Sequence, residues 1–176
     1  MILYFLRHAS AGQRQLTADD DKRPLDNDGI EQCGLVGRML ISLGAEFDRI
    51  ITSPLERALQ TATLVAREIK FKDQIQTDEA LRPEATYDSF RQLLRRHAKA
   101  ESLMVVGHNP NLSEFLSLLI SDGSADTSIY LKKGGLARVE LEGRGAPLLN
   151  WCLTPKLVRK IQESMGTSSR PKTSRK

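Results

Sequence analysis

Short apolar runs along the chain predict the strands of a central sheet. Ile2–Leu6 is an uninterrupted apolar run, and Ser102–Gly107 (SLMVVG) repeats the pattern. Runs of this kind are typical of strands that are buried on both faces. Weaker signals predict further strands over residues 47–52, 134–141 and 148–153, and a short edge strand or extended segment within residues 74–81.

Between these runs, apolar residues recur at the spacing of amphipathic helices. Leu35, Met39 and Leu43 share one face of a helix predicted over residues 30–43, which Asp28 or a neighbour caps. The run Ser53-Pro54-Leu55-Glu56 predicts a capping box, with Ser53 as the N-cap of a helix that reaches residue 69. Further helices are predicted over residues 87–97, 109–119 and 154–161, the second of them with Asn109 as cap and Pro110 as its first residue.

Strands that alternate with helices predict a three-layer α/β/α sandwich with a mainly parallel central sheet. The 176 residues, 40% of them hydrophobic and 27% charged, suit one domain with a full core. We expect this domain to occupy residues 1–163. Residues 164–176, rich in Ser, Thr, Lys and Arg, are expected to form a basic, disordered C-terminal tail.

The net charge of +4 is concentrated in the tail, and the rest of the chain is close to neutral. We therefore expect no nucleic-acid binding, with an acidic partner for the tail as the open alternative. No apolar run approaches the roughly 18 residues of a membrane helix, and the N-terminus has no signal-peptide pattern. Cys33 and Cys152 are expected to be free thiols with neither metal nor redox duty, so a cytoplasmic location is expected.

Three predicted strands lead into basic residues. Arg7 and His8 follow the first strand and precede the small residues Ala9–Gly12, while His108 follows the strand at 102–107. Arg57 lies near the start of the helix that follows the strand at 47–52. Because the carboxyl ends of parallel strands meet at one sheet edge, where such folds bind ligands, we expect these four side chains to converge. The alternative for each residue alone is structural, since an arginine can end a strand and a histidine can pack beneath a loop.

Two arginines and two histidines at one sheet edge would form a positive pocket suited to a phosphoryl group. The chain has no Walker loop and no carboxylate cluster with a magnesium pattern, so we expect neither a metal nor a cofactor. A site of this kind needs a side-chain nucleophile, and His8 in its neutral form can serve. Arg7, Arg57 and His108 would hold the phosphoryl oxygens.

The polar stretch after the first strand offers second-rank candidates. Asp19–Asp21 lack the alternating spacing of a calcium loop and are predicted to lie in a solvated loop. Arg23 follows them, and Pro24 restricts its backbone. Arg23 and Ser10 are therefore predicted as further substrate contacts.

The motifs at these strand ends resemble the histidine phosphatase superfamily, which includes the cofactor-independent phosphoglycerate mutases. They are Leu6-Arg7-His8-Ala9, then Ser53-Pro54 with Arg57-Ala58 and Gln60-Thr61, and finally Gly107-His108. Arg23-Pro24-Leu25 with Gly29, and the run from Val105 to Pro110, are similar to the SixA-type phosphohistidine phosphatases. The resemblance spans residues 1–153 and implies a phosphoglycerate mutase-like fold and a phosphohistidine enzyme intermediate on His8.

Two departures from the superfamily pattern affect the expected chemistry. Ala9 stands where the superfamily most often has glycine, and the chain has only a short segment where mutase-like members carry an insertion with an acid. Glu79 and Glu84 are the candidate general acids, although neither lies in a convincing motif. An imidazole leaving group, with a pKa of about 6.5, needs less help from an acid than an alkoxide, so the pocket suits a phosphoramidate better than an ester.

These observations predict a metal-independent phosphatase for phosphohistidine on a signalling phosphotransfer protein. A phosphatase for small phosphate esters, with Glu79 or Glu84 as acid, is the first alternative. A catalytically weak module that binds phosphoproteins is the second. The oligomeric state is left open.

Overall fold

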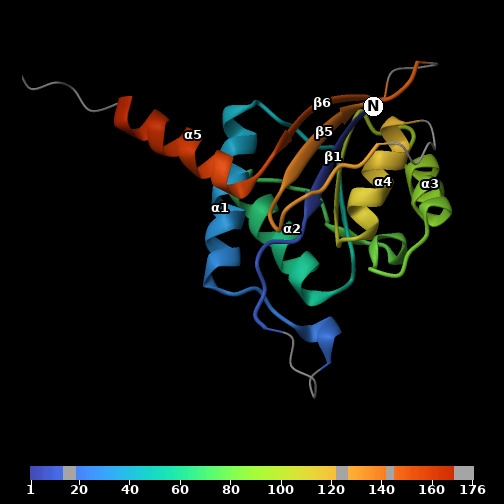
Figure 1. Cartoon of the computed structure of the whole chain (residues 1–176), viewed down its shortest axis with the longest axis horizontal. Helices are drawn as coiled ribbons and strands as arrows, with labels where there is room; N and C mark the ends of the chain where they lie inside the picture. The colour runs from blue at the N-terminus through green and yellow to red at the C-terminus, as the bar shows by residue number, and fades with distance from the viewer. Residues whose placement is uncertain (14–18, 122–126, 142–144, 169–176) are drawn as a thin grey trace, which may run out of the picture.

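The computed structural model describes residues 1–13, 19–121, 127–141 and 145–168, with side chains as far as Ser164. Six strands form one sheet in the order β3-β2-β4-β1-β5-β6. Figure 1 shows β1, β5 and β6 side by side. The strands are β1 (Ile2–Arg7), β2 (Arg49–Thr52), β3 (Gln76–Thr77), β4 (Ser102–Gly107), β5 (Leu136–Glu140) and β6 (Leu148–Leu153).

The first four strands are parallel, and the last two reverse the direction of the sheet. β1 pairs in parallel with β4, in a register that sets Arg7 opposite Gly107. β4 also pairs in parallel with β2, and β2 with β3. β5 runs antiparallel to β1, and β6 antiparallel to β5. The carboxyl ends of β1, β2 and β4 therefore lie at the same edge as the start of β5.

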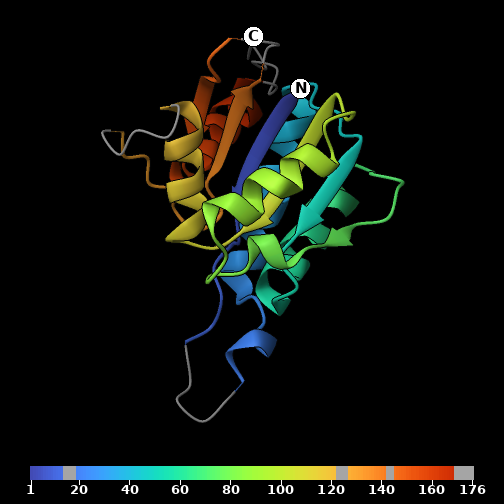
Figure 2. The same cartoon turned by 90° about the vertical axis from the view of Figure 1, so that its right-hand side faces the viewer.

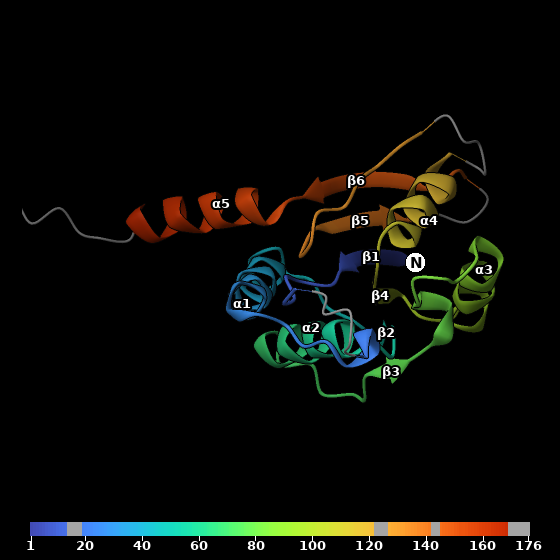
Figure 3. The same ribbon diagram turned by 60° about the horizontal axis from the view of Figure 1, so that its bottom comes forward.

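Helices cover both faces of the sheet because β1 and β4 are apolar on both. Tyr4 and Leu6 face α1 (Asn27–Ser42) and α2 (Glu56–Glu68), whereas Leu3 and Phe5 face α3 (Tyr87–Arg96) and α4 (Asn111–Ile120). Figure 2 looks onto the face that α3 and α4 cover, and Figure 3 shows the two helix pairs on either side of β1 and β4. The predicted three-layer sandwich with a mainly parallel sheet is confirmed.

The last helix, α5 (Pro155–Ser168), packs on α1 through Val158, which lies against Leu35 and Met39. This helix includes the first residues of the predicted tail, and residues 169–176 lie outside the described residues. Within the described part of the chain, every helix is too short or too polar to cross a membrane.

Two predicted helix caps are wrong. α2 begins at Glu56 with Leu55 as its N-cap, and Ser53 instead directs its hydroxyl to His108 Nε2 at 2.8 Å. α4 begins at Asn111 with Pro110 as its N-cap, while the amide of Asn109 donates to the carbonyl of Leu131 at 3.0 Å. Ser53 Oγ still accepts from the N–H of Leu55 at 3.3 Å, and Asn109 Oδ1 accepts from the hydroxyl of Ser113 at 2.8 Å, so each side chain has a local partner beside its distant one.

Candidate active site

Arg7 and His8 leave β1 at the carboxyl edge of the sheet. Arg7 Nη1 donates to the carbonyl of Leu131 at 2.9 Å, and its guanidinium carbon lies 5.7 Å from the ring centre of Tyr130. His8 is 5% exposed, and its Nδ1 lies 2.8 Å from the carbonyl of Ala9. A carbonyl only accepts hydrogen bonds, so neutral His8 carries its proton on Nδ1 and a lone pair on Nε2. Nε2 makes no hydrogen bond within the described residues.

His108 leaves β4 beside His8, and the two ring centres lie 5.0 Å apart. Ser53 Oγ accepts from the backbone N–H of Leu55 at 3.3 Å, and within the described residues its own proton has only His108 Nε2, at 2.8 Å, as an acceptor. This arrangement puts the proton of neutral His108 on Nδ1. Nδ1 is buried and has no hydrogen-bond partner within the described residues.

Burial and nearby cations keep both histidines neutral. The pKa of His8 is lowered to about 3, chiefly by burial and then by the positive charges of Arg57, Arg7 and Lys133. The pKa of His108 is lowered to about 2, again chiefly by burial, then by His8, Arg57 and Arg7. A histidine nucleophile must be neutral, and His8 has that form over the physiological pH range.

Arg57 lies in the first turn of α2 and is 4% exposed. Its Nη1 donates to the backbone carbonyl of Asp20 at 2.8 Å, and its Nη2 forms an ion pair with Asp20 Oδ2 at 3.3 Å. Asp20 belongs to a short turn of 3-10 helix, η1 (Asp20–Lys22), which lies beyond the carboxyl end of β1 (Figure 2). Arg57 therefore faces the same sheet edge as Arg7 and the two histidines.

The loop after His8 is anchored to two helices. The N–H of Ala9 donates to Thr61 Oγ1 at 3.1 Å, and that hydroxyl donates to the carbonyl of Arg57 at 2.6 Å. The hydroxyl of Ser10 donates to Asp26, the N-cap of α1, at 2.8 Å. Gly29 permits this approach, because a Cβ there would lie 2.0 Å from the carbonyl oxygen of Ser10. The hydroxyl of Ser10, predicted as a phosphate contact, is thus engaged in anchoring the loop.

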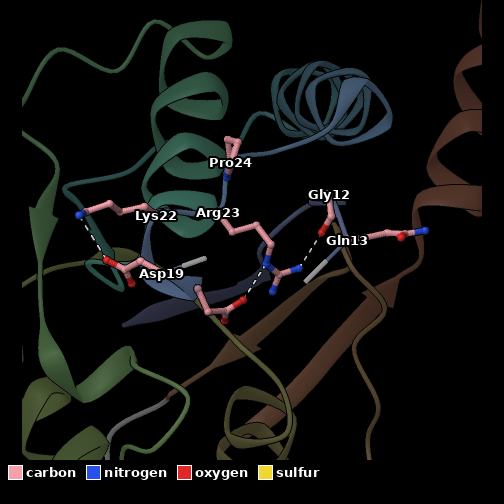
Figure 4. A pocket seen from close by; sticks show the side chains of 7 residues that line it. Gly12, Gln13, Asp19, Lys22, Arg23 and Pro24 are labelled. Atoms are coloured by element: carbon pink, nitrogen blue, oxygen red, sulfur yellow. Dashed lines mark hydrogen bonds and ion pairs between the residues drawn. The ribbon is translucent and has the colours of Figure 1, made fainter. Parts of the chain in front are cut away.

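Arg23 lies at the outer side of the site. Its Nε pairs with Asp20 Oδ1 at 2.9 Å, and its Nη1 donates to the carbonyl of Gly12 at 2.9 Å (Figure 4). A hollow of about 540 Å³ opens here, lined by Gly12, Gln13, Asp19, Asp20, Lys22, Arg23 and Pro24. Asp20 contacts both Arg23 and Arg57. Arg23, which was predicted from the sequence as a further substrate contact, therefore borders the site.

Glu79 and Glu84, the candidate general acids, both pair with Arg82. Arg82 Nε lies 2.6 Å from a carboxylate oxygen of Glu84 and 3.5 Å from one of Glu79. The hydrogen bond from Arg82 lowers the pKa of Glu84. A carboxyl held in its ionised form has no proton to donate, so this arrangement does not favour Glu84 as a general acid.

Several residues at this edge were not identified from the sequence as candidates. Asp20 belongs to a run predicted to be a solvated loop, and nothing local to that run signals its contact with Arg57. Tyr130 and Lys133 approach because β5 is antiparallel, so the segment before it reaches the site. Within the described residues, no group of three or more histidine, cysteine or carboxylate side chains is arranged to hold a metal ion.

Comparisons with known proteins agree with this geometry. Residues 3–101 match the model of the histidine phosphatase superfamily, branch 1. An uncharacterized protein of Picosynechococcus is 37% identical over 77% of this chain and 82% of its own. The phosphohistidine phosphatase SixA of Escherichia coli is 25% identical over 88% of this chain and 94% of its own.

Solved structures show the same fold. The protein histidine phosphatase SixA complexed with tungstate superimposes with a TM-score of 0.80 at 23% identity, covering 89% of this chain and 98% of that one. The alpha-ribazole phosphatase of Shigella flexneri has a TM-score of 0.68 at 17% identity, covering 88% and 97%. The family and fold expected from the motifs are confirmed: the chain belongs to branch 1 of the histidine phosphatase superfamily and is a SixA-like phosphatase.

Proposed function

We propose that this phosphatase removes the phosphoryl group from phosphohistidine on a signalling phosphotransfer protein, through a phosphorylated His8. The observation that carries the proposal is the state of His8. Its proton is held on Nδ1 by the Ala9 carbonyl, burial and cations keep the ring neutral, and Nε2 therefore has a free lone pair.

In the first step, His8 Nε2 attacks phosphorus in line, and the bond between phosphorus and the substrate imidazole breaks. The leaving imidazole keeps the electron pair and takes a proton from solvent. In the second step, water attacks the phosphoryl group on His8, releases inorganic phosphate and restores the neutral ring. Arg7, Arg57 and His108 hold the equatorial oxygens, where charge develops in the transition state.

Buried donors support the anionic nature of the ligand. Arg7 Nε and His108 Nδ1 are buried and have no hydrogen-bond partner within the described residues. Leaving such a donor unpaired costs about 1–3 kcal/mol. A phosphoryl oxygen placed between them would satisfy both donors.

The leaving group must be one that departs without a proton from a side-chain acid. Both candidate acids pair with Arg82, and the pKa of Glu84 is lowered by its hydrogen bond to that residue. An ester oxygen leaves as a strong base and needs a proton donor. Imidazole is a much weaker base, since the pKa of its conjugate acid is about 6.5, and it leaves more readily. A phosphoramidate is therefore the favoured substrate, and the name of the Escherichia coli relative supports the same class.

A small phosphate ester is the second candidate substrate. The hollow of about 540 Å³ beside Arg23 offers room for a small leaving group. The similarity of fold to an alpha-ribazole phosphatase also favours this candidate. A binding module without turnover is less favoured, since the nucleophile and three cationic or donor side chains converge.

The test compares three substrates in the presence of a chelator: a histidine-phosphorylated phosphotransfer domain, a phosphoserine peptide and an aryl phosphate. We expect rapid loss of phosphohistidine alone, and an acid-labile, base-stable label on the wild-type protein. His8→Ala, checked for folding by circular dichroism, should lose both. Fast ester hydrolysis with phosphohistidine untouched would refute the substrate class, and full turnover by His8→Ala would refute the covalent step.

A further inference from the structure

The carboxylate of Asp20 lies between two arginines of the site. Oδ2 is 3.3 Å from Arg57 Nη2, and Oδ1 is 2.9 Å from Arg23 Nε. The Asp20 backbone carbonyl accepts a further hydrogen bond from Arg57 Nη1 at 2.8 Å. The Arg57 side chain is 5% exposed, so little of this interaction is screened by water.

A carboxylate and a phosphoryl group make the same demand on a guanidinium. Each presents two oxygens that accept from the arginine fork, and each is anionic. We propose that Asp20 is a built-in competitor of the phosphoryl group for Arg57. Its carboxylate neutralises Arg57 in the free protein, and an incoming phosphoryl group must displace it or bind against its charge. This inference rests on the proposed function in assigning Arg57 to the phosphoryl oxygens.

The neighbouring aspartates have other partners, which makes the role specific to Asp20. Asp19 pairs with Lys22 at 3.3 Å and accepts from the backbone of Asp21, so it stabilises the turn itself. Asp21 pairs with Arg82 at 2.7 Å. In the described part of the chain, Asp20 alone of the three places its carboxylate against Arg57. Asp19 and Asp21 are therefore matched controls of the same charge on the same turn.

Competition by Asp20 would favour the release of the product, inorganic phosphate. Inorganic phosphate offers only the contacts of the phosphoryl site, whereas a phosphorylated substrate adds contacts through its leaving group. Competition with the Asp20 carboxylate therefore lowers the affinity for inorganic phosphate, so that the product is released easily. A larger substrate offsets this loss of affinity through the contacts of its leaving group. The competitor discriminates in favour of substrates with a sizeable leaving group.

The alternative is that Asp20 merely orients Arg57, and the two roles predict opposite results. In Asp20→Asn the side chain keeps an acceptor for the arginines but loses its charge. As a competitor, its removal tightens binding of inorganic phosphate and tungstate by roughly tenfold and lowers their inhibition constants equally. As a positioning residue, its loss weakens both ligands and lowers kcat.

The experiment is calorimetric titration of wild type, Asp20→Asn, Asp19→Asn and Asp21→Asn with phosphate and with tungstate, beside product-inhibition kinetics on the histidine-phosphorylated phosphotransfer domain. We expect tighter binding in Asp20→Asn only, at an unchanged melting temperature. Unchanged or weaker binding in folded Asp20→Asn overturns the competitor role. Arg57→Ala separates the two proposals: if its loss leaves phosphate and tungstate binding intact, the assignment of Arg57 is wrong, and the competitor role fails with it.

Discussion

Thr61→Val tests whether a single buried hydroxyl holds the loop that follows His8. Thr61 is 1% exposed, and its hydroxyl accepts from the N–H of Ala9 and donates to the carbonyl of Arg57. Valine matches threonine in shape, so no cavity forms. The carbonyl of Arg57 keeps its helical partner, but the Ala9 N–H is left buried and unpaired, which costs about 1–3 kcal/mol.

We therefore expect Thr61→Val to lose about 2 kcal/mol of unfolding free energy. Thr61→Ser keeps the hydroxyl and loses one methyl group, worth about 1 kcal/mol. The order of stability should be wild type, then serine, then valine, so that the most hydrophobic of the three side chains gives the least stable protein. Urea unfolding with linear extrapolation measures this difference.

Turnover should follow the same order, because Ala9 is covalently joined to His8. A nucleophile displaced by a fraction of an ångström loses in-line geometry, and we expect a fall in kcat of about tenfold in Thr61→Val. A valine variant as stable as wild type, or more stable than the serine variant, would show that the hydroxyl is not the anchor of the loop.

Three further predictions follow from the site and its supports. His8 has a folded-state pKa of about 3, below its unfolded value, so the unfolded chain binds the proton first and stability falls as the pH drops through 6.5. Between pH 7 and pH 5 the loss of unfolding free energy is about 2 kcal/mol. His8→Gln should remove this loss in unfolding titrations. Equal slopes for both proteins would contradict the pKa. Gly29→Ala should cost about 1–3 kcal/mol of stability by forcing its Cβ against the Ser10 carbonyl, whereas Gly34→Ala, which meets only the flexible end of Arg38, should be neutral or stabilising in thermal melts. Ser53→Ala should weaken phosphate binding roughly tenfold by freeing the tautomer of His108, read from its imidazole nitrogen shifts; unchanged shifts would exclude that role.

The strands that carry the chemistry were predictable because their pattern is independent of their surroundings. Ser102–Gly107 is apolar along its length, and the structure places β4 on the same residues. A residue that follows such a strand lies at the sheet edge whatever the rest of the chain does, so Arg7, His8 and His108 could be located from the sequence. Arg57 followed from the same logic, one helical turn further on.

Features decided by distant partners could not be predicted. Ser53 has the local sequence of an N-cap, but α2 begins at Glu56, and the Ser53 hydroxyl contacts the imidazole of His108, which follows another strand. Asp20 looks like any surface aspartate until Arg57 is placed opposite it. The reversal of β5 depends on which strand it pairs with, and no spacing in the chain encodes that choice.

The reversal of β5 divides the rim of the site into two parts with different freedom to change. The sides made by the ends of β1, β2 and β4 are constrained, since each of these strands has hydrogen-bonded neighbours on both sides. Tyr130 and Lys133 lie in the segment that precedes β5, and β5 is separated from the side of the sheet only by the last strand, β6. Leu131 in this segment is buried, and its carbonyl accepts from Arg7. Substitutions at the exposed residues Tyr130, Lys132 and Lys133 alter the rim without touching the parallel strands. Redesign of substrate preference should therefore start there, and the nucleophile and its supports can be left untouched.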